Sequence, residues 1–123
     1  ALYQNMGPPC FTQYGGIAAL RYGEDFITQQ MTLWQTNRDT VAQRLSNMPR
    51  IIFPVPDATF YAFFKVGGVT NSMQFAREMI DEVGLSLAPG SSFGSACEGF
   101  LRLCYGVSTP RLHDALDRLE RLC

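Results

Sequence analysis

A charged residue inside an apolar run most constrains how this chain can fold. Residues 100–105, FLRLCY, have the composition of a β-strand, and Arg102 stands in their middle. A guanidinium is always charged and holds its N–H donors in a flat fork, so burying it among apolar side chains requires a carboxylate or a phosphate. Strand alternation places Arg102 on one face with Phe100 and Cys104, and both faces of the strand are predicted to be largely buried.

Three environments could compensate the charge of Arg102. The arginine could pair with an acid of the chain such as Glu98, lie on the solvated face of an edge strand, or bind the anion of a ligand. Burial of both strand faces disfavours the solvated edge. Internal pairing and ligand binding both remain open from the residue pattern.

The length and charge of the chain set limits on its class. A chain of 123 residues can bury one hydrophobic core, so we predict a single domain over residues 1–123. Ten basic and eleven acidic residues give a net charge of -1 without a basic block, so neither nucleic acid nor a membrane surface is a predicted partner. We find no signal peptide and no membrane-spanning apolar run, which together with unpatterned cysteines predicts a cytoplasmic location.

The cysteines and the histidine do not form a metal-binding pattern. The four cysteines lack CxxC spacing, and the single histidine, His113, falls in a helical segment away from them. We therefore predict no metal ligands and no catalytic residue, and we interpret the thiols as buried or incidental.

Hydrophobic periodicity and turn residues predict four helices and four strands. The predicted helices cover residues 12–22, 24–47, 72–83 and 109–122, and the predicted strands cover residues 51–53, 59–66, 85–88 and 100–106. Asn71 or Ser72 and Ser108 are predicted helix caps, and Gly84 is predicted to end the third helix in a left-handed conformation. This order predicts an α+β fold, a small antiparallel or mixed sheet with helices on one side.

The second helix carries a long apolar stripe. Its members recur at steps of three, four or seven residues and are predicted to face one core: Ile27, Met31, Trp34, Val41, Leu45 and Met48.

Three segments together resemble a known family. Residues 56–63, PDATFYAF, are similar to a Pro-x-Gly-x-Phe-Tyr-x-Phe strand, with Ala58 in place of the usual glycine. Residues 84–94, GLSLAPGSSFG, and 98–106, EGFLRLCYG, follow at the spacing of that family. The chain thereby resembles the C-terminal small domain of fold-type I, pyridoxal-phosphate-dependent aminotransferases of class I/II, the group that includes aspartate and aromatic aminotransferases.

The resemblance implies a function and two site residues. It implies that Arg102 binds the α-carboxylate of the substrate during amino-group transfer between an amino acid and a 2-oxo acid, and that Phe60 borders the substrate pocket. In the family, pyridoxal phosphate is held mainly by a large domain that carries the Schiff-base lysine. The only lysine here, Lys65, lacks the Ser-Lys motif of that site, so no cofactor-binding residue is predicted.

The resemblance also implies that the chain is part of a larger enzyme. Residue 1 is Ala rather than an initiating Met, and the large domain is missing, so we expect an inactive fragment of a homodimeric parent. Two alternatives are the same domain from a pyridoxal-phosphate-dependent lyase, and a stand-alone binding or dimerisation module without catalysis. The identity of the substrate amino acid is not predicted.

Overall fold

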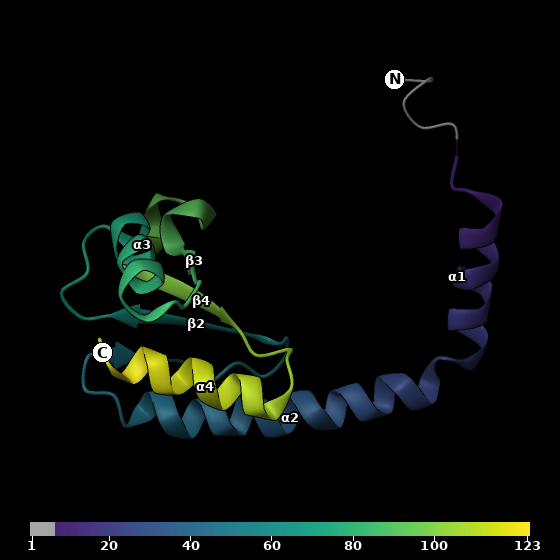
Figure 1. Cartoon of the computed structure of the whole chain (residues 1–123), viewed down its shortest axis with the longest axis horizontal. Coiled ribbons are helices and arrows are strands. Elements are labelled where there is room, and N and C mark those ends of the chain that lie inside the picture. The colour runs from purple at the N-terminus through teal and green to yellow at the C-terminus, as the bar shows by residue number, and fades with distance from the viewer. Residues whose placement is uncertain (1–6) are drawn as a thin grey trace. The chain divides into compact units, whose positions relative to one another are not determined.

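The computed structural model describes residues 7–123 (Figure 1). The described chain divides into two compact units, one that ends at residue 32 and one of residues 33–123. The prediction of one domain over residues 1–123 stays a prediction.

The helices and strands follow the predicted order. In chain order they are α1 (Cys10–Tyr22), α2 (Glu24–Ser46), β1 (Ile51–Ile52), β2 (Tyr61–Val66), α3 (Ser72–Val83), β3 (Ala88–Pro89), the short 3-10 helices η1 (Gly90–Phe93) and η2 (Ser95–Cys97), β4 (Phe100–Cys104) and α4 (Thr109–Glu120). The strand predicted over residues 85–88 is wrong in its bounds, because only its last residue enters β3.

The four strands form one antiparallel sheet in the order β1-β2-β4-β3. Arg102 in β4 lies opposite Phe63 of β2 on one side and opposite Ala88 of β3 on the other. The predicted α+β class with a small antiparallel sheet is confirmed. Because β4 is an inner strand, the solvated-edge alternative for Arg102 is wrong.

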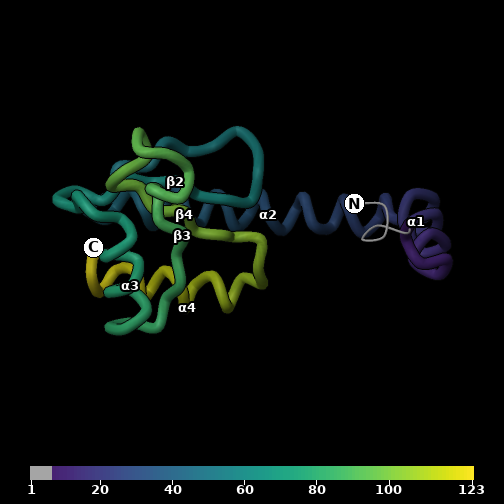
Figure 2. Tube along the Cα trace, turned by 90° about the horizontal axis from the view of Figure 1, so that it is seen from above, coloured from purple at the N-terminus to yellow at the C-terminus, as the bar shows by residue number. Residues whose placement is uncertain are grey.

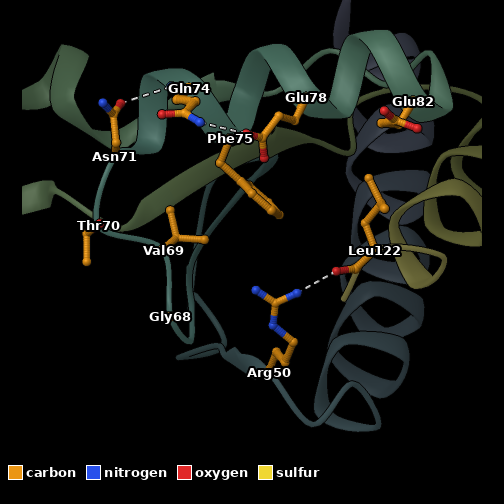
Figure 3. Close-up of a pocket in the computed structure, with 10 residues that line it drawn as sticks. All are labelled: Arg50, Gly68, Val69, Thr70, Asn71, Gln74, Phe75, Glu78, Glu82 and Leu122. Atoms are coloured by element: carbon orange, nitrogen blue, oxygen red, sulfur yellow. Dashed lines mark hydrogen bonds between the residues drawn. The ribbon is translucent and has the colours of Figure 1, made fainter.

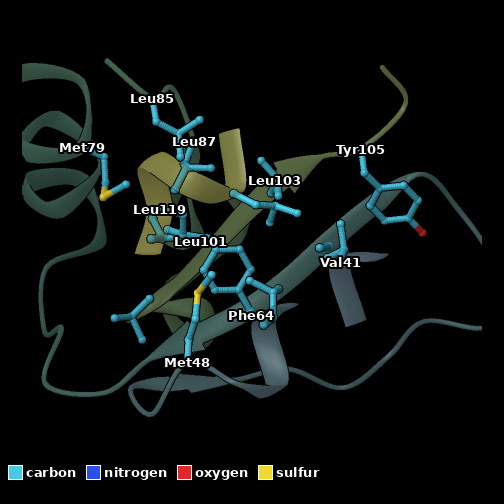
Figure 4. Packing of buried hydrophobic residues seen from close by; sticks show 14 of the residues in the cluster. Val41, Met48, Phe64, Met79, Leu85, Leu87, Leu101, Leu103, Tyr105 and Leu119 are labelled. Atoms are coloured by element: carbon cyan, nitrogen blue, oxygen red, sulfur yellow. The ribbon is translucent and has the colours of Figure 1, made fainter. Parts of the chain in front are cut away.

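One face of the sheet carries the hydrophobic core. Ala62, Phe64 and Val66 of β2 and Leu101 and Leu103 of β4 point to this face and are buried. Figure 4 shows side chains from the helices and from the 85–87 segment gathered around Phe64 and Leu101. In the view of Figure 2, α4 runs beside the strands, and its Leu112, Leu116 and Leu119 are fully buried.

The opposite face of the sheet is more open. Phe100 and Arg102 are half-buried and Cys104 is exposed, so the prediction that both faces of this strand are largely buried is wrong. The helices of the second unit contribute to one core on the other face, and within residues 33–123 they leave this face partly uncovered. We call the side chains of β2 and β4 on this side the outer face.

The ends of α3 have the predicted caps. The Asn71 side chain accepts a hydrogen bond from the Gln74 amide at 2.9 Å, and Gly84 takes a left-handed φ of 64°. Ser108 precedes α4 as predicted, but its side chain makes no capping hydrogen bond.

A buried amide ties α2 to the end of β4. Asn37 is fully buried, and its Nδ2 donates to the carbonyls of Tyr105 at 2.9 Å and Val107 at 2.8 Å. The Thr109 hydroxyl donates to Asn37 Oδ1 at 3.3 Å. The apolar stripe did not include Asn37 because it is polar, although it lies three residues after Trp34 on the same helical face.

The apolar stripe of α2 divides at the boundary between the two units. Val41, Leu45 and Met48 are buried as predicted, but Ile27 and Met31 are exposed. In the first unit α1 has no buried residue, and the large exposed apolar side chains are Phe11, Tyr14, Ile17, Leu20, Tyr22, Phe26, Ile27 and Met31. We call this set the N-terminal apolar surface.

None of the cysteines is fully buried, which leaves the incidental interpretation of the thiols. All four are free; Cys10 and Cys104 are exposed, and Cys97 and Cys123 are partly buried. Over residues 7–123, no helix combines the length and the apolar character needed to cross a membrane.

Candidate functional site

The guanidinium of Arg102 lies against two aromatic rings on the outer face. Its Cζ is 4.3 Å from the ring centre of Tyr61 and 4.6 Å from that of Phe93. Tyr61 begins β2, the strand next to Arg102, and Phe93 ends η1. Aromatic faces attract a cation, but they accept no in-plane hydrogen bond from its N–H groups.

Arg102 differs from the other partly buried arginines of the described chain. Arg38 pairs with Asp39 at 2.9 Å, Arg44 pairs with Asp117 and Glu120 at 2.8 Å, and Arg118 pairs with Asp114 at 2.9 Å. For the side chain of Arg102, residues 7–123 provide neither an ion pair nor a hydrogen bond, only the two rings. Its in-plane donors therefore stay free for an anion from outside this segment.

Glu98, the acid considered for internal pairing, has another partner. Its Oε1 accepts hydrogen bonds from the Ser72 amide at 2.5 Å and from the Gly99 amide at 3.2 Å. The hydrogen bond from the Ser72 amide is the main reason that the pKa of Glu98 lies below its ordinary value. Pairing of Arg102 with Glu98 is therefore wrong.

The lowered pKa of Glu98 predicts a pH-dependent stability. A depressed folded-state pKa stabilises the fold above the ordinary value of 4.5, and this contribution is lost as the pH falls through the lowered pKa. We expect Glu98→Gln to lower the melting temperature at neutral pH, and we expect the difference from the native chain to shrink below about pH 4.5. The melting-temperature difference is measured by thermal unfolding, followed by circular dichroism, in steps of about half a pH unit from about pH 3 to about pH 7.

The control for this prediction is Glu82→Gln. Glu82 is exposed, and the described residues donate no hydrogen bond to its carboxylate. A melting-temperature difference for Glu98→Gln that stays constant over the whole pH range would contradict the assigned role.

Phe60 contacts Tyr61, one of the two rings beside Arg102, but it makes no ring contact with Arg102 itself. Its ring centre is 4.5 Å from that of Tyr61 and 4.9 Å from that of Trp34. Its carbonyl accepts a hydrogen bond from the Tyr105 amide at 2.9 Å. The structure thus places Phe60 one ring away from the guanidinium, at the end of β4 that lies near Tyr105.

Two residues of this site were not predicted. Tyr61 and Phe93 contact Arg102 directly, whereas the resemblance pointed to Phe60. Strand alternation could have placed Tyr61 on the same face as Phe63. Phe93 had no such signal, because it lies in a 3-10 turn whose path the residue pattern does not define.

The described residues alone do not form a pyridoxal-phosphate site. Lys65, the only lysine, is exposed on β2, with its Nζ 5.9 Å from the Phe100 ring centre. A Schiff-base lysine needs a desolvated or cation-flanked amine, and the pyridine nitrogen needs an acid beside it. The surroundings of Lys65 do not meet these needs, so no chemical step is assigned to a cofactor on this segment.

A separate pocket lies away from the outer face (Figure 3). It has a volume of about 470 Å³ and is lined by Arg50, Gly68, Val69, Thr70, Asn71, Gln74, Phe75, Glu78, Glu82 and Leu122. Arg50 already donates to the Leu122 carbonyl at 2.8 Å and to the Gly67 carbonyl at 3.1 Å. Neither Arg102 nor Phe60 lines it, so the pocket is not the predicted site.

The geometry of the outer face suits a carboxylate. A planar guanidinium binds a carboxylate through two parallel N–H···O bonds, and the Tyr61 and Phe93 rings beside it accept no such in-plane bond. The fold and the site together define the class: an α+β domain whose outer face carries an arginine without an acidic partner among residues 7–123.

Sequence comparison assigns the family. The sequence model of the aminotransferase class I and II family matches residues 4–119. The chain belongs to this family, and the resemblance inferred from the three segments is confirmed.

Relatives and solved structures agree with this assignment. The LL-diaminopimelate aminotransferase of Nitratidesulfovibrio vulgaris is 35% identical over 121 residues, which cover 97% of this chain and 31% of that protein. The structure of the aromatic aminotransferase from Pyrococcus horikoshii has a TM-score of 0.86 at 29% identity and covers 98% of this chain and 33% of that one. The aspartate aminotransferase structure from Thermotoga maritima has a TM-score of 0.74 at 34% identity, over 89% of this chain and 27% of that one. The chain thus spans about a third of the length of these relatives.

Proposed function

We propose that this chain is the C-terminal small domain of a pyridoxal-phosphate-dependent aminotransferase and that Arg102 binds the α-carboxylate of its substrate. The parent enzyme transfers an amino group between an amino acid and a 2-oxo acid, and it acts as a cytoplasmic homodimer. One observation carries the proposal: Arg102 is the partly buried arginine of the described chain that has aromatic neighbours but no acid.

The physical reason is the cost of an unpaired charge. A partly desolvated guanidinium without a partner is unfavourable, and a ligand carboxylate removes that cost through two charge-assisted hydrogen bonds. Amino acids and 2-oxo acids share an α-carboxylate, so one arginine can serve both substrates. A fixed carboxylate also orients the reacting carbon, which accelerates group transfer.

Phe60 has a supporting role in this proposal. Its ring is half-buried, packs against the hydrophobic core and lies next to the rings of Trp34 and Tyr61, and Tyr61 in turn contacts Arg102. An apolar wall here would exclude water from the carboxylate contact and strengthen it.

The remainder of the parent supplies what these residues lack. Pyridoxal phosphate acts as an electron sink for carbanion chemistry, and a large domain would hold it together with its lysine. The N-terminal apolar surface supports such a neighbour, because eight large apolar side chains stay exposed there and Leu20 reaches 89% exposure. We propose that the large domain covers this surface.

The test is an activity assay of the full-length protein that carries this sequence. We expect it to convert 2-oxo acids to amino acids with a panel of amino-group donors, and we expect the 123-residue chain alone to be inactive. Product is measured by chromatography, and ammonia is measured in parallel.

Each other outcome points to another function. Ammonia release without amino-group transfer would identify a lyase with the same domain. A protein that neither transfers amino groups nor releases ammonia, and that binds no amino acid, would contradict the proposal and favour a non-catalytic module.

A further inference from the structure

We infer that Phe93 is a positioning residue, which fixes the plane of the Arg102 guanidinium so that its N–H edge faces the substrate carboxylate. This inference rests on the proposed function, because it concerns the same arginine. It adds a specific role for the segment from Gly90 to Cys97, which we call the clamp loop.

Phe93 is placed to act on Arg102 rather than on the hydrophobic core. Its side chain is 46% exposed, so it contributes little to the hydrophobic core. Its ring nonetheless lies 4.6 Å from the Arg102 Cζ and meets the Phe63 ring edge-on, at 5.8 Å and 84°. An exposed aromatic ring held against a cation is better explained by orientation of that cation than by burial.

The clamp loop holds Phe93 in place through close backbone packing at Gly90. A Cβ at Gly90 would lie 2.0 Å from the Cys97 carbonyl oxygen and 2.7 Å from that of Phe100. Only glycine therefore allows the start of the loop to pass so close to its own end and to β4.

A buried serine anchors both ends of the clamp loop. Ser72 is fully buried, and its hydroxyl accepts a hydrogen bond from the Ser91 amide at 3.1 Å. The Ser72 amide donates to Glu98, the residue that follows the loop. Because one residue at the start of α3 binds both sides of the loop, Phe93 is held at a fixed distance from β4.

The geometry has a consequence for binding. Tyr61 comes from the sheet and Phe93 from the loop, so the guanidinium is restricted by two independent elements. An arginine side chain loses much rotamer freedom when it is immobilised, and a guanidinium that is already oriented loses less on binding. Loss of the Phe93 ring is therefore expected to weaken carboxylate binding without a direct effect on the chemical step.

The test compares two variants of the full-length protein. Phe93→Leu keeps an apolar side chain but removes the ring, and Phe93→Tyr keeps the ring. We expect Phe93→Leu to raise KM for the amino acid and Kd for a dicarboxylate probe, succinate, roughly five- to ten-fold. We expect kcat to change less than about two-fold, and we expect Phe93→Tyr to match the native protein.

A spectroscopic measurement separates orientation from general disruption. The Phe93 ring lies 4.6 Å from the Arg102 Cζ, so its ring current is expected to shift the guanidinium protons. We expect the Nε–H NMR resonance of Arg102, assigned by its loss in Arg102→Lys, to move in Phe93→Leu and to stay in Phe93→Tyr. Unfolding temperatures are measured for both variants, and because Phe93 is exposed we expect little change.

The outcomes distinguish this inference from the proposed function. If Arg102→Ala abolishes succinate binding while Phe93→Leu leaves KM, Kd and the NMR resonance unchanged, the positioning role is wrong and the carboxylate role stands. If Arg102→Ala leaves binding unchanged, the proposed function itself is wrong. Equal losses in Phe93→Leu and Phe93→Tyr would also overturn the positioning role.

Discussion

Arg102→Ala is expected to abolish useful substrate binding by the full-length protein. Removing one partner of a desolvated, hydrogen-bonded charge pair costs roughly 2 to 5 kcal/mol, which corresponds to a loss in kcat/KM of about thirty-fold to several thousand-fold. Within the described chain the arginine has no acid that its removal would leave unpaired, so the loss falls on ligand binding. Steady-state kinetics and calorimetric titration with succinate measure it.

Two variants control this prediction. Arg102→Lys keeps the positive charge but loses the planar fork, so its kcat/KM should lie between those of the native protein and the alanine variant. Arg77→Ala removes an exposed arginine from α3 and should leave kinetics unchanged. Native kinetics in Arg102→Ala would reject a carboxylate-binding role.

Among the variants proposed for this chain, Phe64→Ala is expected to produce the largest loss in the free energy of unfolding. The Phe64 ring is fully buried in the centre of the core, opposite Leu101 in the sheet. Truncation of a buried phenylalanine to alanine costs about 3 to 5 kcal/mol, because apolar contacts are lost and a cavity remains. This is a large part of the roughly 5 to 15 kcal/mol that stabilises a domain. We therefore expect the variant chain to be partly unfolded at about 37 °C.

The matched control is Phe93→Ala, which removes the same ring from an exposed position. Because Phe93 is 46% exposed, its free energy of unfolding should fall by less than about 1 kcal/mol. Urea denaturation of the 123-residue chain, followed by circular dichroism, measures both variants. Equal losses would contradict the division between the core face and the outer face.

The sequence predicted the fold well where local signals agree. Periodicity placed α3 and α4, and Asn71 and Gly84 marked the ends of α3, because caps and left-handed glycines depend on neighbouring residues alone. It failed for the strand at residues 85–88, because pairing with β4 depends on the path of the chain and not on the composition of Leu85 to Leu87.

The candidate site was predicted only in part. The apolar run singled out Arg102, but alternation could not show that one face of its strand is half-exposed. The contact between Phe93 and Arg102 joins a 3-10 turn to a strand, and no local periodicity reports such a pair. The burial of Asn37 was not predicted for a related reason, because it depends on the carbonyls of Tyr105 and Val107, far along the chain.

The two sides of strand β4 have a consequence for how such a protein can diversify. Leu101 and Leu103 point to the core, while Phe100, Arg102 and Cys104 point away from it. A change at one of the latter three positions leaves the packed interior intact, so new ligand preferences can be selected there without a matching loss of folding. The neighbouring residues, one step away along the same backbone, have no such freedom.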